Sequence, residues 1–128
     1  MTKNTKQLIK ELENHVARDV IKLATNITKK IIERNPVDIR FSASSWFWSI
    51  GAPLLIDTDR TLDNVAKQEA LQDSTIVSLK AGYTFKDGKL YITNNVNYIG
   101  LLENGSSKQA PNGFVKKSVS DGVHQTRQ

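Results

Sequence analysis

The sequence contains no cysteine among its 128 residues, and only three prolines. Without cysteine the chain forms no disulfide and offers no thiolate ligand to a metal, which points away from a small secreted domain. No apolar run approaches the roughly 18 residues that cross a membrane. The polar, lysine-rich start also lacks the apolar core of a signal peptide. We therefore expect a protein that is made in the cytoplasm and does not enter a membrane.

The composition is that of one ordinary folded domain spanning residues 1–128. Hydrophobic residues make up 38% and charged residues 24%, which separates the chain from disordered sequences. The net charge of +5 is spread unevenly, because residues 1–40 and 108–128 are basic and residues 41–107 are mildly acidic. Such a division suits contact with nucleic acid, or subunits that pack with opposite charges facing. It equally suits a solvated surface with some excess lysine.

Apolar residues recur every three or four positions from about Lys3 to Arg34, which predicts a long amphipathic α-helix. The stripe consists of Leu8, Leu12, Val16, Val20, Leu23, Ile27 and Ile31. Asn35-Pro36 ends the helix, since a residue before proline is pushed out of the α region. At 1.5 Å per residue the helix is about 45–50 Å long. That exceeds what a small domain needs, so the first turns either reach a neighbouring subunit or fray.

The middle of the chain predicts one strand and one helix. In residues 45–50, Trp46, Trp48 and Ile50 alternate onto one face, with Phe47 on the other. Two tryptophans so close together favour a core position over an interface. Residues 61–80 keep helical spacing and predict a helix ending near Gly82, although residues 74–80 alone also fit a strand.

The last third predicts a β region followed by helices. Asp87-Gly88 is typical of a hairpin turn, here between strands at 83–85 and 90–94. A short helix from Tyr98 to Asn104 and a loop follow. Phe114, Val115, Val119 and Val123 then trace a final helix, whose polar tail is expected to fray. The expected fold class is α+β, with a long N-terminal amphipathic helix and further helices packed on a small, mainly antiparallel β-sheet.

The sequence offers little for catalysis or metal binding. It has no glycine-rich phosphate loop and no nucleophile elbow. His15 and His124 lie on opposite terminal helices, and the Asp57 and Asp59 pair lacks the glycine and distal glutamate of a calcium loop. Glu103 has no evident nucleophile or base partner and is better suited to a structural hydrogen bond. We expect no cofactor, no metal and no enzymatic activity.

Nucleic-acid binding is the alternative function. The basic ends lack the interleaved aromatic residues of a single-strand binder and the spacing of a helix-turn-helix. Loose contact with a DNA backbone is still compatible with the charge. The alternative is therefore a small basic nucleic-acid-binding module.

Several stretches resemble the head–tail joining proteins of tailed bacteriophages, also described as tail-completion or neck proteins. Pro36-Val37-Asp38 followed by Ala43-Ser44-Ser45-Trp46 is similar to one signature of that family, with Ile39-Arg40 where threonine and glycine usually stand. Residues 91–99 are similar to its strand-to-helix junction. The most specific resemblance is residues 102–115, where a Glu-x-Gly-Ser loop and an Ala-Pro-x-Gly loop precede the last helix.

This resemblance implies a virion structural protein at the head–tail junction or the proximal tail end. Such proteins form rings around the DNA channel, commonly sixfold, whose partners are further copies and other neck, connector or tail proteins. The residues implied for the structural motif and the interfaces are Trp46, Trp48, Tyr98, Glu103, Gly105, Ser106, Pro111 and Gly113. Non-specific contact with DNA in the channel is implied for Lys108, Lys116 and Lys117.

Overall fold

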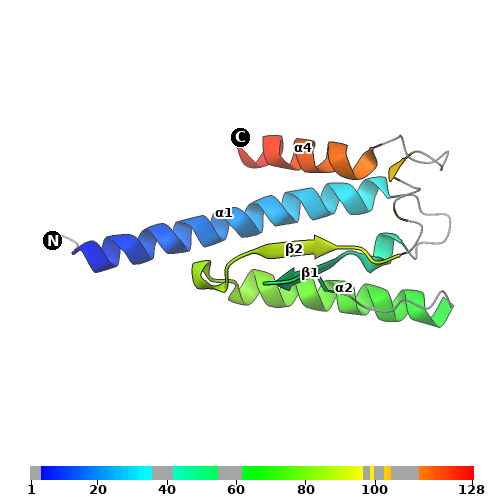
Figure 1. The fold of residues 1–128 in the computed structure, drawn as a ribbon, viewed down its shortest axis with the longest axis horizontal. Helices are drawn as coiled ribbons and strands as arrows, with labels where there is room; N and C mark the ends of the chain where they lie inside the picture. The colour runs from blue at the N-terminus through cyan, green and yellow to red at the C-terminus, as the bar shows by residue number, and fades with distance from the viewer. Residues whose placement is uncertain (1–3, 36–41, 55–61, 97–98, 100–102, 105–112) are drawn as a thin grey trace.

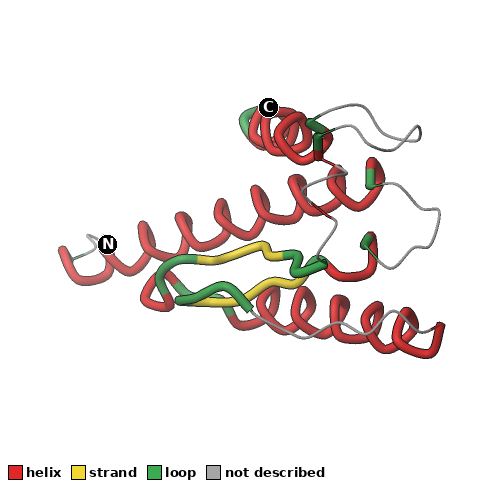
Figure 2. Tube along the Cα trace, turned by 45° about the vertical axis from the view of Figure 1, so that its right-hand side comes forward, coloured by secondary structure: helices red, strands yellow, loops and turns green. Residues whose placement is uncertain are grey.

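The computed structural model describes residues 4–35, 42–54, 62–96, 99, 103–104 and 113–128, with the backbone alone for residues 62–64. The elements lie in layers in the order α4 (Phe114–Thr126), α1 (Thr5–Arg34), a two-stranded sheet and α2 (Leu62–Gly82) (Figure 1). Figure 2 shows the same order from a second direction. The α+β class predicted from the sequence is confirmed.

Helix α1 is one continuous helix of 30 residues that begins and ends with local signals. The Asn4 side chain accepts from the Gln7 amide at 2.9 Å, and the Gln7 side chain accepts from the Asn4 amide at 3.1 Å. This reciprocal capping box stabilises the first turn without help from the rest of the fold. Asn35 takes an extended conformation and ends the helix, as predicted.

The sheet pairs strands that are far apart in the sequence. Strand β1 (Phe47–Ile50) runs antiparallel to β2 (Leu90–Thr93), with Trp48 opposite Ile92. Trp46 lies just before β1, at the end of a 3-10 turn (Ala43–Ser45), so the predicted strand begins later than expected. Gly51 follows β1 with a φ of +81°, in the left-handed region that glycine tolerates.

Residues 62–82 form α2 throughout, which excludes the strand alternative for residues 74–80. The helix packs beside β1 and the 3-10 turn that precedes it. Thr75 Oγ1 accepts from the Trp48 amide at 3.2 Å, and Gln72 Nε2 donates to the Ala43 carbonyl at 2.9 Å. These bonds attach α2 to the outer edge of β1.

The predicted hairpin around Asp87-Gly88 is wrong. Phe85–Asp87 forms a 3-10 turn, η2, and Leu90–Thr93 pairs with β1 instead of with residues 83–85. The Asp87 carboxylate accepts from both the amide and the hydroxyl of Thr84, at 2.8 and 3.1 Å. This local cap holds residues 84–87 in a turn rather than a strand, because a side-chain acceptor competes with ladder pairing.

Helix α4 packs along the C-terminal half of α1 (Figure 1). The fraying expected for its polar tail is wrong, since the helix extends to Thr126. Asn26 Nδ2 on α1 donates to Thr126 Oγ1 at 2.9 Å and holds this end in place. The predicted short helix at 98–104 lies mostly outside the described residues, of which Ile99 and Glu103 are helical.

The core joins the end of α1 to the start of both β1 and α4. Its buried members are Ile31, Trp46 and Phe114, and the half-buried residues packed around them are Ile27, Ile32, Ile92, Ile99 and Val115. Phe47 and Trp48 are also buried, on opposite faces of β1. Burial of these large apolar side chains supplies most of the favourable free energy of folding.

Candidate functional site

Both tryptophans singled out by the sequence are buried within the single chain and donate to α1. Trp46 Nε1 donates to Asn35 Oδ1 at 3.0 Å, and Trp48 Nε1 donates to Thr28 Oγ1 at 2.8 Å. A buried indole N–H needs such an acceptor, since leaving it unpaired is costly. These tryptophans therefore serve the core and fix the sheet against α1.

Glu103 is hydrogen-bonded to the first turn of α4. Its two carboxylate oxygens accept from the amides of Val115 and Lys116 at 2.8 and 3.1 Å. Its own carbonyl accepts from the Gly113 amide at 2.6 Å. The carboxylate thus caps the helix N-terminus from outside, in place of the side chain that Gly113 lacks. Gly113 has a φ of +79°, so glycine is favoured there.

The remaining motif residues are only partly placed. Tyr98, Gly105, Ser106, Lys108 and Pro111 lie outside the described residues. Glu103 and Gly113 are brought together, while Trp46 and Trp48 are buried in the protein interior. Glu103 has a structural role here, as the sequence suggested.

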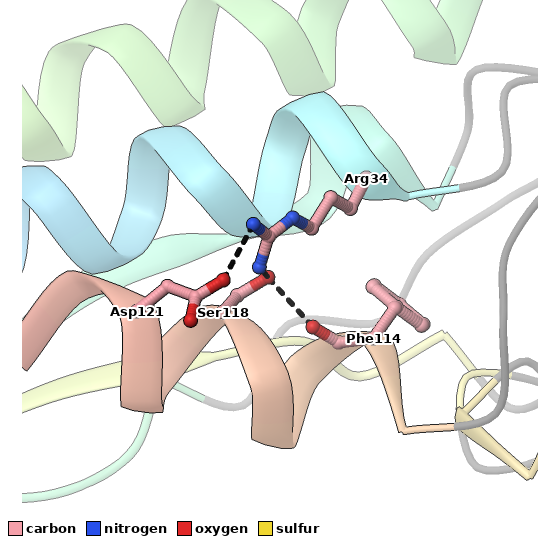
Figure 3. A network of polar contacts seen from close by, with 4 residues as sticks. All are labelled: Arg34, Phe114, Ser118 and Asp121. Carbon is pink, nitrogen blue, oxygen red and sulfur yellow. Dashed lines mark hydrogen bonds and ion pairs between the residues drawn. The ribbon is translucent and has the colours of Figure 1, made fainter.

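Lys116 and Lys117 are exposed on the first turns of α4. They lie beside a polar contact between α1 and α4 in which Arg34 Nη2 pairs with Asp121 Oδ2 at 2.7 Å (Figure 3). The Arg34 hydrogen bond lowers the pKa of the Asp121 carboxyl, against the opposing effect of burial, and the charges of Arg34, Lys117 and Lys30 lower it further. Lys116 and Lys117, with Lys30 and Arg34 nearby, therefore make this part of the α1–α4 surface rich in positive charge.

Helix α4 approaches α1 through small residues that the sequence analysis missed. Ser118 and Gly122 are buried one turn apart, and Ser118 Oγ donates to the Phe114 carbonyl at 2.6 Å (Figure 3). A Cβ at Gly122 would lie 2.6 Å from Ile27 Cγ1 and 2.9 Å from Ile27 Cα. The signal available in the sequence is the spacing of four residues between Phe114, Ser118 and Gly122, whereas the apolar pattern of this helix follows its valines.

Within the described residues, no group of three His, Asp or Glu side chains is arranged to hold a metal ion. His15 pairs with Asp19 at 3.4 Å on α1, and His124 lies near Gln128 on α4. Asp57 and Asp59 lie outside the described residues. None of the helices in the described part of the chain is both long and apolar enough to cross a bilayer.

The N-terminal end of α1 exposes apolar side chains to solvent. Leu8, Ile9 and Leu12 are 52%, 52% and 63% exposed, although Leu8 and Leu12 belong to the apolar stripe and Ile9 lies beside it. Beside them, α1 and η2 border an open groove of about 460 Å³ that includes Ile9 and Phe85. This helix end projects past the rest of the fold (Figures 1 and 2). Contiguous exposed apolar side chains are uncommon on the surface of a monomeric protein.

Comparison with known proteins gives no match: no protein-family model fits the chain, and no curated protein or solved structure is significantly similar to it.

Proposed function

We propose that this chain is a structural protein of a tailed-phage virion, which acts at the head–tail junction or the proximal tail end. It assembles there as a ring subunit, with sixfold symmetry, around the DNA channel. The sequence motifs suggest this family, and the exposed apolar end of α1 is the observation that carries the proposal. A locally capped helix that presents Leu8, Ile9 and Leu12 to solvent is suited to docking on another protein chain.

A ring requires heterologous contacts, in which one surface meets a different surface of the next subunit. The end of α1 can serve as one of these surfaces because it is distant from the core and takes no part in it. The cationic face at Lys116 and Lys117 is a separate surface, at the other end of α1. Under this proposal it faces the DNA passage and makes only non-specific phosphate contacts.

Co-sedimentation with phage particles tests the proposal. Heads and tails assembled without this chain are mixed with the purified protein and pelleted. The wild-type protein is expected to pellet with one of the two particles and to restore head–tail joining. The Leu8→Asp, Leu12→Asp double variant is expected to stay folded and in the supernatant.

Val77→Asp is the matched control, because Val77 is an exposed apolar residue, 65% accessible, on α2 rather than α1. It should pellet like the wild type. A wild-type protein that ignores both particles, but binds short duplex DNA with sequence preference, would replace the proposal with the nucleic-acid-binding alternative.

A further inference from the structure

Strand β2 has one edge in the ladder with β1 and a second edge that no described residue pairs with. The Gly51 amide donates to the Lys89 carbonyl at 2.9 Å, which identifies that pair as hydrogen-bonded. Since hydrogen-bonded and non-bonded pairs alternate in an antiparallel ladder, Tyr91 also bonds inward, to Ser49. The N–H and C=O groups of Leu90 and Ile92 therefore point away from β1.

The two outer edges of the sheet differ. The outward Trp48 amide of β1 donates to Thr75 on α2. Within the described part of the chain, nothing pairs with the outward backbone groups of Leu90 and Ile92. An unpaired edge of this kind is a template for another strand.

An apolar groove lies directly beside this open edge. It holds about 370 Å³ and is bordered by Leu90, Tyr91 and Ile92 on the β2 side, and on the α1 side by Val20, Leu23, Ala24 and Ile27. All four residues of β2 are only half-buried. A strand added here gains backbone hydrogen bonds from β2 and an apolar surface from α1. The groove therefore selects an extended segment with apolar side chains at alternate positions.

We infer that the occupant is β2 of a second copy of this chain, paired antiparallel about a two-fold axis through Tyr91. In this register, Leu90 of each copy is opposite Ile92 of the other, and each such pair exchanges both of its N–H···O bonds. The two copies then form one continuous sheet in the order β1–β2–β2–β1.

Three features of β2 favour a second copy over an unrelated peptide. Leu90 and Ile92 alternate with Tyr91 and Thr93, so each copy supplies the apolar face that the other copy's groove requires. Lys89 of one copy falls opposite Thr93 of the other, which keeps the two lysines apart. Pairing about a two-fold axis also covers the unpaired edge of β2 in both copies at once. This contact does not depend on the proposed phage function.

Hydrogen exchange of the wild-type protein at low and high concentration tests the register. The Leu90 and Ile92 amides should gain protection with concentration, while the Tyr91 amide, already bonded to Ser49, should be protected throughout. Sedimentation equilibrium should show a monomer–dimer equilibrium over the same concentrations. A protein that stays monomeric, or a dimer without this alternation, would overturn the inference.

Leu90→Pro supplies the matching variant. It removes an outward N–H at the first position of a strand, where proline is tolerated, and leaves the Lys89 carbonyl free to accept from Gly51. The dimer Kd should rise at least about tenfold with an unchanged far-ultraviolet circular dichroism spectrum. Leu12→Asp, on the exposed end of α1, should leave the Kd unchanged. If Leu12→Asp weakens the dimer and Leu90→Pro does not, the dimer contact lies on α1 and β2 is excluded.

Discussion

At Gly122 the backbone of α4 meets that of α1, and the residue has no room for a side chain. We predict that Gly122→Ala lowers the free energy of unfolding by about 1–3 kcal/mol, because the new Cβ meets Ile27 backbone atoms that cannot move aside. Gly82→Ala is the control, since a Cβ there meets nothing within 4 Å. It should be neutral or stabilising by up to about 1 kcal/mol. Urea denaturation measures the free energy of unfolding of both variants. Equal changes in the two would contradict the close approach of α4 to α1 at Gly122.

Glu103 acts as a helix cap supplied from outside the helix. We predict that Glu103→Ala lowers the free energy of unfolding by about 1–2 kcal/mol, the usual cost of losing a cap. Glu103→Gln should cost less, because its carbonyl oxygen can still accept from one of the two amides. Amide exchange at Val115 and Lys116 should quicken in the alanine variant. Unchanged exchange there would exclude the capping role.

The buried hydrogen bond from Trp48 Nε1 on β1 to Thr28 Oγ1 on α1 is tested by removing its acceptor. Thr28→Val keeps the shape of the side chain but leaves Trp48 Nε1 buried without an acceptor, which should cost about 1–3 kcal/mol. Thr25→Val is the comparison, because the Thr25 hydroxyl donates only to the Ile21 carbonyl of its own helix. Thermal unfolding should show a clearly larger loss for Thr28→Val. A similar loss in both variants would mean that the indole bond contributes little.

The contact between α1 and α4 predicts a pH dependence. The pKa of Asp121 is lowered in the folded protein by Arg34, so the ionised carboxylate favours folding. This contribution is complete above the ordinary pKa of 3.8 and is lost as the pH falls through the lowered folded-state value. Asp121→Asn should remove it, so the stability of the variant should fall less steeply with acid below about pH 4. If the wild type and the variant lose stability equally as the pH falls, the assignment of this pH dependence to Asp121 is contradicted.

At the scale of the whole molecule, the hydrophobic core and the proposed docking surface lie at opposite ends of α1. We predict that deleting residues 1–14 lowers the Tm by no more than about 4 °C, because the exposed leucines and Ile9 lie outside the core. The same deletion should abolish capture by phage particles. A deletion that unfolds the protein would show instead that the first turns support the core.

Local patterns predicted most of the elements. The apolar repeat and Asn35-Pro36 gave α1 its length and its end, and the spacing through residues 62–82 gave α2. The predicted strands at 45–50 and 90–94 contain β1 and β2. Helical and strand periods are properties of neighbouring residues, so a sequence can reveal them without knowledge of the fold.

Pairing and packing were not predictable in the same way. The turn signal at Asp87-Gly88 suggested a local hairpin, but Trp48 on the distant β1 is the residue that faces Ile92. In α4 the buried residues are Phe114, Ser118 and Gly122, while Val119, which the apolar pattern favours, is 40% exposed. The deciding factor is how closely two backbones approach, and hydropathy does not encode that distance.

The sequence by itself determined that the chain is α+β, that its first helix is longer than one small domain requires, and that no familiar catalytic motif is present. Only the tertiary structure decided which part of that helix is covered, that Glu103 caps α4, and that one edge of β2 has no partner among the described residues. The physical reason is that periodicity and capping depend on residues within a few positions of one another. Burial, strand order and an unpaired edge depend on segments that meet only after the chain has folded.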